Sequence, residues 1–171
     1  EIPPLTTRVT NHLPAVSYLK HVNSYDAYIR GDIKIRYAPV EDRVLFYNSE
    51  GTGAVGRSLK PVRSKWWSYG DLSKGIHVGI GTHAVLVEDV ASACSVSNVT
   101  SYTGVALLGT NITKSITKTL NKYQQVTLVL DNDASLKAIS IARKLNMECN
   151  VRLTRSDLKY LRPDQIKDLI I

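Results

Sequence analysis

Two apolar runs near the middle of this 171-residue chain each end in acidic residues. The run 84–87 is followed by Glu88 and Asp89, and the run 126–130 is followed by Asp131 and Asp133. If both runs end at one edge of a sheet, their carboxylates repel one another unless a cation lies between them. Hard divalent ions such as Mg²⁺ take oxygen ligands and are held by carboxylates together with substrate phosphates. These residues therefore predict a metal site, and the metal predicts phosphate chemistry.

The elements around these acids predict an α/β arrangement. The two apolar runs are continuous rather than alternating, which is typical of strands buried on both faces of a parallel sheet. Strands and helices are expected to alternate through this region, in the order strand 84–87, helix 89–98, strand 104–108, helix 112–121, strand 126–130, helix 134–145, strand 149–153 and helix 163–170. Ligands bind at the carboxyl ends of the strands in such sheets, which is where the acids lie.

The chain before residue 84 has a different pattern. Residues 11–30 predict a helix, and three short β-like runs at 33–37, 43–47 and 54–59 predict an antiparallel meander. The segment 60–83 reads as loop and short strands rich in basic and aromatic residues. We therefore expect a small mixed α/β subdomain over residues 1–80 and a Rossmann-like parallel sheet flanked by helices over residues 81–171.

The formal charge of the chain is +7. An acidic centre within a basic protein suits a polyanionic substrate, and nucleic acid is the leading candidate; an ordinary basic protein is nearly as good an explanation of charge alone. The two cysteines and four histidines lack the paired spacing of a zinc site, so no zinc is expected. Few cysteines and no apolar run of membrane-spanning length favour a cytoplasmic protein without a membrane partner.

Three segments of the acidic half resemble the TOPRIM domain, which bacterial-type primases, topoisomerases and some nucleases share. They are 85–93, 106–110 and 128–133, and they supply a Glu after one strand and a DxD pair after a later one. The Leu-Gly-Thr at 108–110 is similar to the matching segment of DnaG-type primases. Upstream, the runs 35–39, 43–46, 53–57 and 64–66 are similar, in their order, to the amino-terminal subdomain of the RNA polymerase core of those primases.

The resemblance implies that Glu88, Asp131 and Asp133 are catalytic and bind Mg²⁺ or Mn²⁺, with two ions expected. The alternative is that these acids only begin the following helices, where the helix dipole favours negative charge. Asp157 matches a further acidic segment of the family and is either a metal ligand or a solvated charge. Asp89 is interpreted as a helix-start acid in preference to an extra ligand.

On the basic side, the resemblance implies that Arg57, Lys65 and Lys74 contact template phosphates or the incoming nucleotide, assisted by Arg36 and Arg63. A solvated surface is the alternative. Trp66 and Trp67 lie beside this stretch, and aromatic rings stack on bases of single strands for about 1–3 kcal/mol each. Tryptophans are also common core anchors. We expect one of the two to face inward and the other outward.

Together these features predict a DNA primase core that joins ribonucleotides on a single-stranded DNA template. The expected partners are ribonucleoside triphosphates and a replicative helicase or a separate zinc-binding module. Asp89 and Leu136 stand where the family has glycine, which indicates a divergent, phage- or plasmid-encoded form. The alternatives are a metal-dependent TOPRIM nuclease and a non-catalytic nucleic-acid-binding module.

Overall fold

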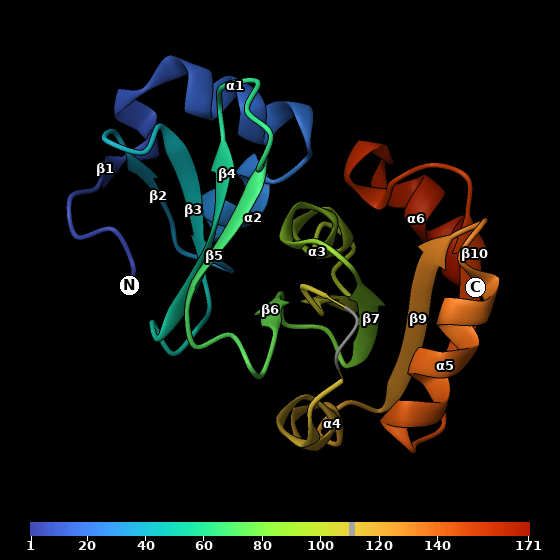
Figure 1. The fold of residues 1–171 in the computed structure, drawn as a ribbon. Coiled ribbons are helices and arrows are strands. Elements are labelled where there is room, and N and C mark those ends of the chain that lie inside the picture. Colours follow the sequence, from blue (N-terminus) through green and yellow to red (C-terminus); the bar gives the residue numbers. More distant parts are fainter. Residues whose placement is uncertain (110–111) are drawn as a thin grey trace.

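The computed structural model describes residues 1–109 and 112–171, and these form two five-stranded sheets (Figure 1). The first sheet is antiparallel, and its strands are neighbours in chain order. Its strands are β1 (Thr7–Arg8), β2 (Ile35–Ala38), β3 (Arg43–Tyr47), β4 (Gly53–Ser58) and β5 (Trp66–Gly70). Three helical segments precede β2: η1 (Val9–Asn11), α1 (Leu13–His21) and α2 (Tyr25–Arg30).

The second sheet has the order β10-β9-β7-β8-β6 and is parallel except for β6, which runs antiparallel to β8. Its strands are β6 (Ile76–Val78), β7 (His83–Val87), β8 (Tyr102–Ala106), β9 (Gln125–Asp131) and β10 (Asn150–Thr154). The helices are α3 (Val90–Val96), α4 (Lys114–Leu120), α5 (Ser135–Leu145), η2 (Leu158–Tyr160) and α6 (Pro163–Ile170). The predicted α/β fold class, with its smaller mixed subdomain first, is confirmed. Strand β6 joins the second sheet although it precedes residue 80.

The central strands of the second sheet are buried on both faces, as their continuous apolar runs predict. Val85 and Val129 pack in a core shared with the amino-terminal subdomain, whereas Leu86 and Leu128 pack in a separate core under α4 and α5. Neighbouring residues of one strand, such as Val85 and Leu86, pack on opposite faces of the sheet because side chains along a strand point to alternate sides. The sheet is therefore a rigid base for the residues that follow its strands.

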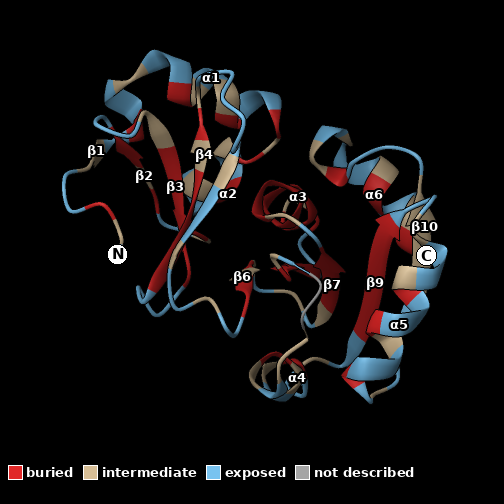
Figure 2. Cartoon of the chain, in the orientation of Figure 1, coloured by how far each residue is buried: buried red, intermediate tan, exposed pale blue. Residues whose placement is uncertain are grey.

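Helix α3 lies between the two sheets, and all of its residues are buried (Figure 2). Its small side chains, such as Ala93, allow β8 to approach closely. A Cβ at Gly104 would lie 2.1 Å from the carbonyl oxygen of Ala93, so this position requires glycine. Both subdomains therefore share one helix as part of one core.

The predicted helix over 11–30 is wrong in one respect, because the chain forms two helices separated at Asn23. Asn23 has a φ of 55°, a left-handed conformation that asparagine tolerates better than most residues. Its side-chain nitrogen donates a hydrogen bond of 2.9 Å to the carbonyl oxygen of Lys159, far along the chain. A tertiary contact thus accompanies the break, and local helix propensity alone does not reveal it.

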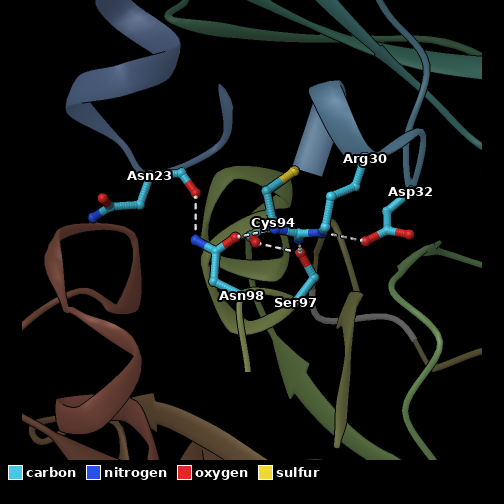
Figure 3. Close-up of polar contacts among 6 residues, drawn as sticks. All are labelled: Asn23, Arg30, Asp32, Cys94, Ser97 and Asn98. Carbon is cyan, nitrogen blue, oxygen red and sulfur yellow. Dashed lines mark hydrogen bonds and ion pairs between the residues drawn. The ribbon is translucent and has the colours of Figure 1, made fainter. Parts of the chain in front are cut away.

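A polar network joins the amino-terminal helices to the end of α3 (Figure 3). Arg30 donates to Asn98 at 2.9 Å and to Ser97 at 3.0 Å, and it pairs with Asp32 at 2.9 Å. Asn98 in turn donates to the carbonyl oxygen of Asn23 at 3.2 Å. The two subdomains are thus connected by charged hydrogen bonds as well as by the shared core. Among the helices of the described residues, none is both long and apolar enough to span a bilayer.

Candidate active site

Acidic residues follow three neighbouring parallel strands of the second sheet. Glu88 follows β7, Asp131 ends β9, and Asp157 lies shortly after β10. Strand β9 pairs with β7 on one side and with β10 on the other, where Thr154 lies opposite Asp131. Because the three strands are parallel, their carboxyl ends meet at one edge. The structure therefore brings together side chains that are up to 69 positions apart in the chain.

Two cavities show how these acids are grouped. A small cavity of about 40 Å³ is lined by Glu88, Asp89, Asp131 and Asp157, together with apolar strand residues. A larger cleft of about 700 Å³ is lined by Asp131, Asp133 and Asp157, and Arg155 and Tyr160 also contribute to its wall. Asp131 and Asp157 belong to both, so the two cavities form one acidic centre. We use this name for Glu88, Asp89, Asp131, Asp133 and Asp157.

The electrostatics of Asp131 reflect this crowding. Partial desolvation raises the pKa of Asp131, and the negative charges of Asp157, Glu88 and Asp133 raise it further. Carboxylates that share a site disfavour one another's ionised form, and a cation relieves that cost. A cation beside Asp131 would therefore favour its ionised form.

The DxD pair differs from its expected geometry in one detail. Two residues that lie two apart in a strand point to one face, but β9 ends at Asp131 and Asp133 lies in the turn that follows. The backbone amide of Asn132 donates a hydrogen bond of 2.8 Å to the carbonyl oxygen of Thr154. The backbone amide of Ala134 donates one of 2.9 Å to the carbonyl oxygen of Asp131. The turn still leaves Asp131 and Asp133 on the wall of the same cleft.

Two lysines form ion pairs with the acidic centre, and neither is among the site residues predicted from the sequence. Lys137, in the first turn of α5, forms an ion pair with Glu88. Lys159, in η2, lies 3.7 Å from a carboxylate oxygen of Asp89 and 3.8 Å from one of Asp157. Lys137 follows Asp133 by four positions and lies in the first turn of the helix after it. This spacing could have indicated a lysine close to the acids, because side chains about four positions apart lie on one side of a helix. Nothing local marks Lys159.

The acidic centre matches a hard divalent ion in the chemistry of its donors, because carboxylate oxygens are the ligands that Mg²⁺ and Mn²⁺ prefer. Desolvation raises the pKa of Asp131, and the neighbouring negative charges of Asp157, Glu88 and Asp133 add to the shift. Within residues 1–109 and 112–171, no group of three His, Cys, Asp or Glu side chains converges closely enough to hold a metal as it stands. The ammonium groups of Lys137 and Lys159 lie on the carboxylates instead.

Asp89 begins α3, in agreement with its preferred interpretation. Its side chain accepts a hydrogen bond of 2.8 Å from the amide of Ser92, which is the N-cap arrangement. Asp89 also lines the small cavity and contacts Lys159. It therefore has a structural role and a place in the acidic centre at the same time.

A groove of about 320 Å³ connects the acidic centre to the first sheet. Glu88, Asp89 and Leu108 line it from one subdomain, and Trp66 and Ser68 line it from β5. Trp66 is half-buried and packs on Phe46, whereas Trp67 is 53% exposed on the other face of the strand. The expectation of one inward and one outward tryptophan matches this arrangement. Thr110, the last residue of the Leu-Gly-Thr segment, lies outside the described residues.

Arg57 lies beside Trp66, on the same face of the first sheet. Its guanidinium carbon is 5.3 Å from the centre of the Trp66 ring and 5.6 Å from that of Tyr18. Its Nε is buried and has no hydrogen-bond partner among the described residues. Burial raises the pKa of Tyr18, and the Arg57 charge opposes that shift. The guanidinium of Arg57 thus lies against two aromatic rings and keeps one buried N–H group without a partner among the described residues. This combination suits an anionic ligand.

The other predicted basic residues do not line the cavities described above. Arg36 lies on the opposite face of the first sheet from Arg57, where it donates to the Thr6 hydroxyl and carbonyl oxygens, each at 3.2 Å. Arg63 and Lys65 are exposed on the connection between β4 and β5, and Lys74 is exposed before β6. Their proposed contacts with nucleic acid remain predictions.

Comparison with known protein families and with curated proteins finds no match. Solved structures match at the level of the fold. The catalytic core of the E. coli primase is 15% identical with a TM-score of 0.62, covering 94% of this chain and 69% of that one. The zinc-binding and RNA polymerase domains of the Aquifex aeolicus primase are 18% identical with a TM-score of 0.59, covering 93% and 48%. The RNA polymerase domain of Mycobacterium tuberculosis DnaG, bound to double-stranded DNA with a 6-nucleotide overhang, is 20% identical with a TM-score of 0.57, covering 75% and 52%.

The chain therefore has the fold of the catalytic core of DnaG-type primases. It spans about half the length of the M. tuberculosis domain that it matches, with 52% of that chain covered. At 14–20% identity, the likeness concerns the arrangement of the elements.

Proposed function

We propose that this chain is the catalytic core of a DNA primase, which joins ribonucleotides on a single-stranded DNA template. The observation that carries the proposal is the acidic centre at the carboxyl ends of β7, β9 and β10, which opens through Glu88 onto a groove lined by Trp66. One side of that groove suits phosphates bridged by cations, and the other suits bases. The similar primase domains whose structures contain single- or double-stranded DNA support a nucleic-acid substrate.

Glu88, Asp131 and Asp133 are the proposed ligands of Mg²⁺ or Mn²⁺, and Asp157 is a further candidate. When bound, divalent ions neutralise the charge of the nucleotide phosphates and lower the pKa of the attacking 3′-hydroxyl. Glu88 also lines the groove from which the hydroxyl would approach, so it is the proposed acceptor of the hydroxyl proton. Asp131 lies at the centre of the carboxylates and fixes where the transferred phosphate is held.

Arg57 and Trp66 are the proposed contacts to the template or to the incoming nucleotide. The buried Nε of Arg57 lacks a partner among the described residues, and a phosphate oxygen would supply one. Trp66 offers a half-buried ring at the groove, on which a base can stack. Ribonucleoside triphosphates and single-stranded DNA are thus the proposed substrates.

An assay with a single-stranded template, labelled ribonucleotides and Mg²⁺ or Mn²⁺ tests the proposal. A primase makes short RNA products that need all three components. A nuclease would shorten the template, and a binding module would only shift its mobility in a gel. Product formation that survives in Asp131→Ala and Asp133→Ala would contradict the assigned mechanism, and no product from the wild-type chain on any template would contradict the function.

A further inference from the structure

The acidic centre already contains two positive charges, and these are held in different ways. The Lys137 side chain is 39% exposed, and among the described residues its one ion-pair partner is the half-exposed Glu88. The Lys159 side chain is 14% exposed and lies between two carboxylates, those of Asp89 and Asp157. An ammonium group on one exposed partner is easily displaced, because water and salt screen such pairs. The charge of a mostly buried side chain that lies between two acids is harder to displace.

The backbone around Lys159 is fixed by contacts from distant elements. The hydroxyl of Ser95 in α3 donates to the carbonyl oxygen of Leu158 at 2.8 Å, and Asn23 donates to that of Lys159 at 2.9 Å. Leu158 itself is buried at 3% exposure. The Lys159 ammonium also lies 5.5 Å from the centre of the Tyr160 ring. These contacts fix the backbone from which the Lys159 side chain extends, and the low exposure of that side chain keeps it packed against the acidic centre.

We propose that Lys159 is a built-in cation of the acidic centre, which offsets one of the two negative charges of Asp89 and Asp157, so that the free protein binds a single divalent ion through Glu88, Asp131 and Asp133. A second divalent ion near Asp89 and Asp157 would lie a few ångströms from the positive charge of a mostly buried side chain, where solvent screens repulsion less than at an exposed site. On this proposal a second ion enters only with the phosphates of a nucleotide. The inference rests on the proposed metal-dependent function.

The test counts Mn²⁺ ions bound by the full chain without nucleotide, using the electron paramagnetic resonance signal of free Mn²⁺. The wild-type protein should bind one ion. Lys159→Gln should bind two, because it exposes the charges of Asp89 and Asp157. Lys159→Arg should return the count to one. The matched control is Lys137→Gln, which should keep a count of one and bind Mn²⁺ about threefold more tightly.

A second variant keeps the proposal testable if Lys159→Gln does not fold. Asp89→Asn preserves the cap of α3, since asparagine is as good an N-cap as aspartate. Because this carboxylate already pairs with Lys159, the variant should change Mn²⁺ affinity by less than about twofold. A tenfold loss of affinity would mean that Asp89 holds the ion, and it would overturn the proposal.

The remaining outcomes separate this inference from the proposed function. Two ions on the wild-type protein, or one ion on a folded Lys159→Gln variant, would overturn the role of Lys159 and leave the proposed primase function in place. No Mn²⁺ bound by the wild-type protein, or unchanged binding in Asp131→Asn, would overturn both, because the acidic centre would then hold no metal.

Discussion

Glu88 and Trp66 line the same groove from opposite sheets, and the chain places them by different means. Glu88 follows a parallel strand that is buried on both faces, so its position at the sheet edge is fixed by the direction of the strand alone. Trp66 lies within an antiparallel strand, where the adjacent Trp67 faces the other way. The acidic side of the groove thus depends on where strands end, and the basic, aromatic side depends on which face each residue takes.

The sharpest way to break this comparison is to remove Asp131. Asp131→Ala should lower primer synthesis by at least about a thousandfold, equivalent to roughly 4 kcal/mol of transition-state stabilisation. The protein should remain folded, because Asp131 is exposed at the end of β9 and removal of its charge relieves repulsion. Synthesis rates are measured beside circular dichroism spectra, and an unfolded variant would mean that the acid has a structural role.

The second prediction compares the two tryptophans. Trp66→Ala should lower the free energy of unfolding by roughly 2 kcal/mol, less than a fully buried tryptophan would lose because the side chain is half-buried. Trp67→Ala should change it by less than about 0.5 kcal/mol, since its ring is mainly in solvent. Urea unfolding measures both. Equal losses would show that the two faces of β5 do not differ as described.

The third prediction compares two arginines on opposite faces of the first sheet. Arg57→Gln should weaken binding of single-stranded DNA about tenfold, or roughly 1.4 kcal/mol, and reduce the salt dependence by about one charge. Arg36→Gln should change binding less than twofold, because its donors already contact Thr6. Fluorescence anisotropy at two salt concentrations provides the measurement. Similar losses in both variants would indicate a diffuse effect of net charge.

The smallest expected effect concerns stability and pH. The pKa of Asp131 is raised in the folded protein, so the folded state binds this proton more readily than the unfolded chain does. Stability therefore rises as the pH falls through the raised pKa. Asp131→Asn should be more stable than the wild type at pH 7 by less than about 1 kcal/mol, since solvent screens the exposed group. The difference should shrink as the pH falls through the pKa of Asp131, and a constant difference would contradict this account.

The sequence predicts where Glu88 and Asp131 lie in the fold, for a physical reason. A continuous apolar run followed by acids defines both a buried strand and what lies at its end, and Glu88 and Asp131 needed no further information. The role of Asp157 stays open in the sequence, because its segment matches the acidic segment of the family only loosely. The structure places it with the other acids through the pairing of β10 with β9.

The features that the sequence did not predict depend on tertiary contacts. Arg36 and Arg57 look alike in the sequence, and only the register of β2, β3 and β4 puts them on opposite faces. The break between α1 and α2 accompanies the bond from Asn23 to η2. Lys159 enters the acidic centre because the same bond, together with Ser95, fixes its backbone. None of these follows from neighbours along the chain.

Helix α3 has a consequence for how the groove can move. It begins at the residue that follows Glu88 and Asp89, it is buried throughout, and it belongs to the core that both subdomains share. Opening the groove like a hinge would require this helix to leave one of the two sheets and expose apolar surface. The width of the groove is thus set during folding, and a nucleic-acid strand must fit it by adjusting its own shape.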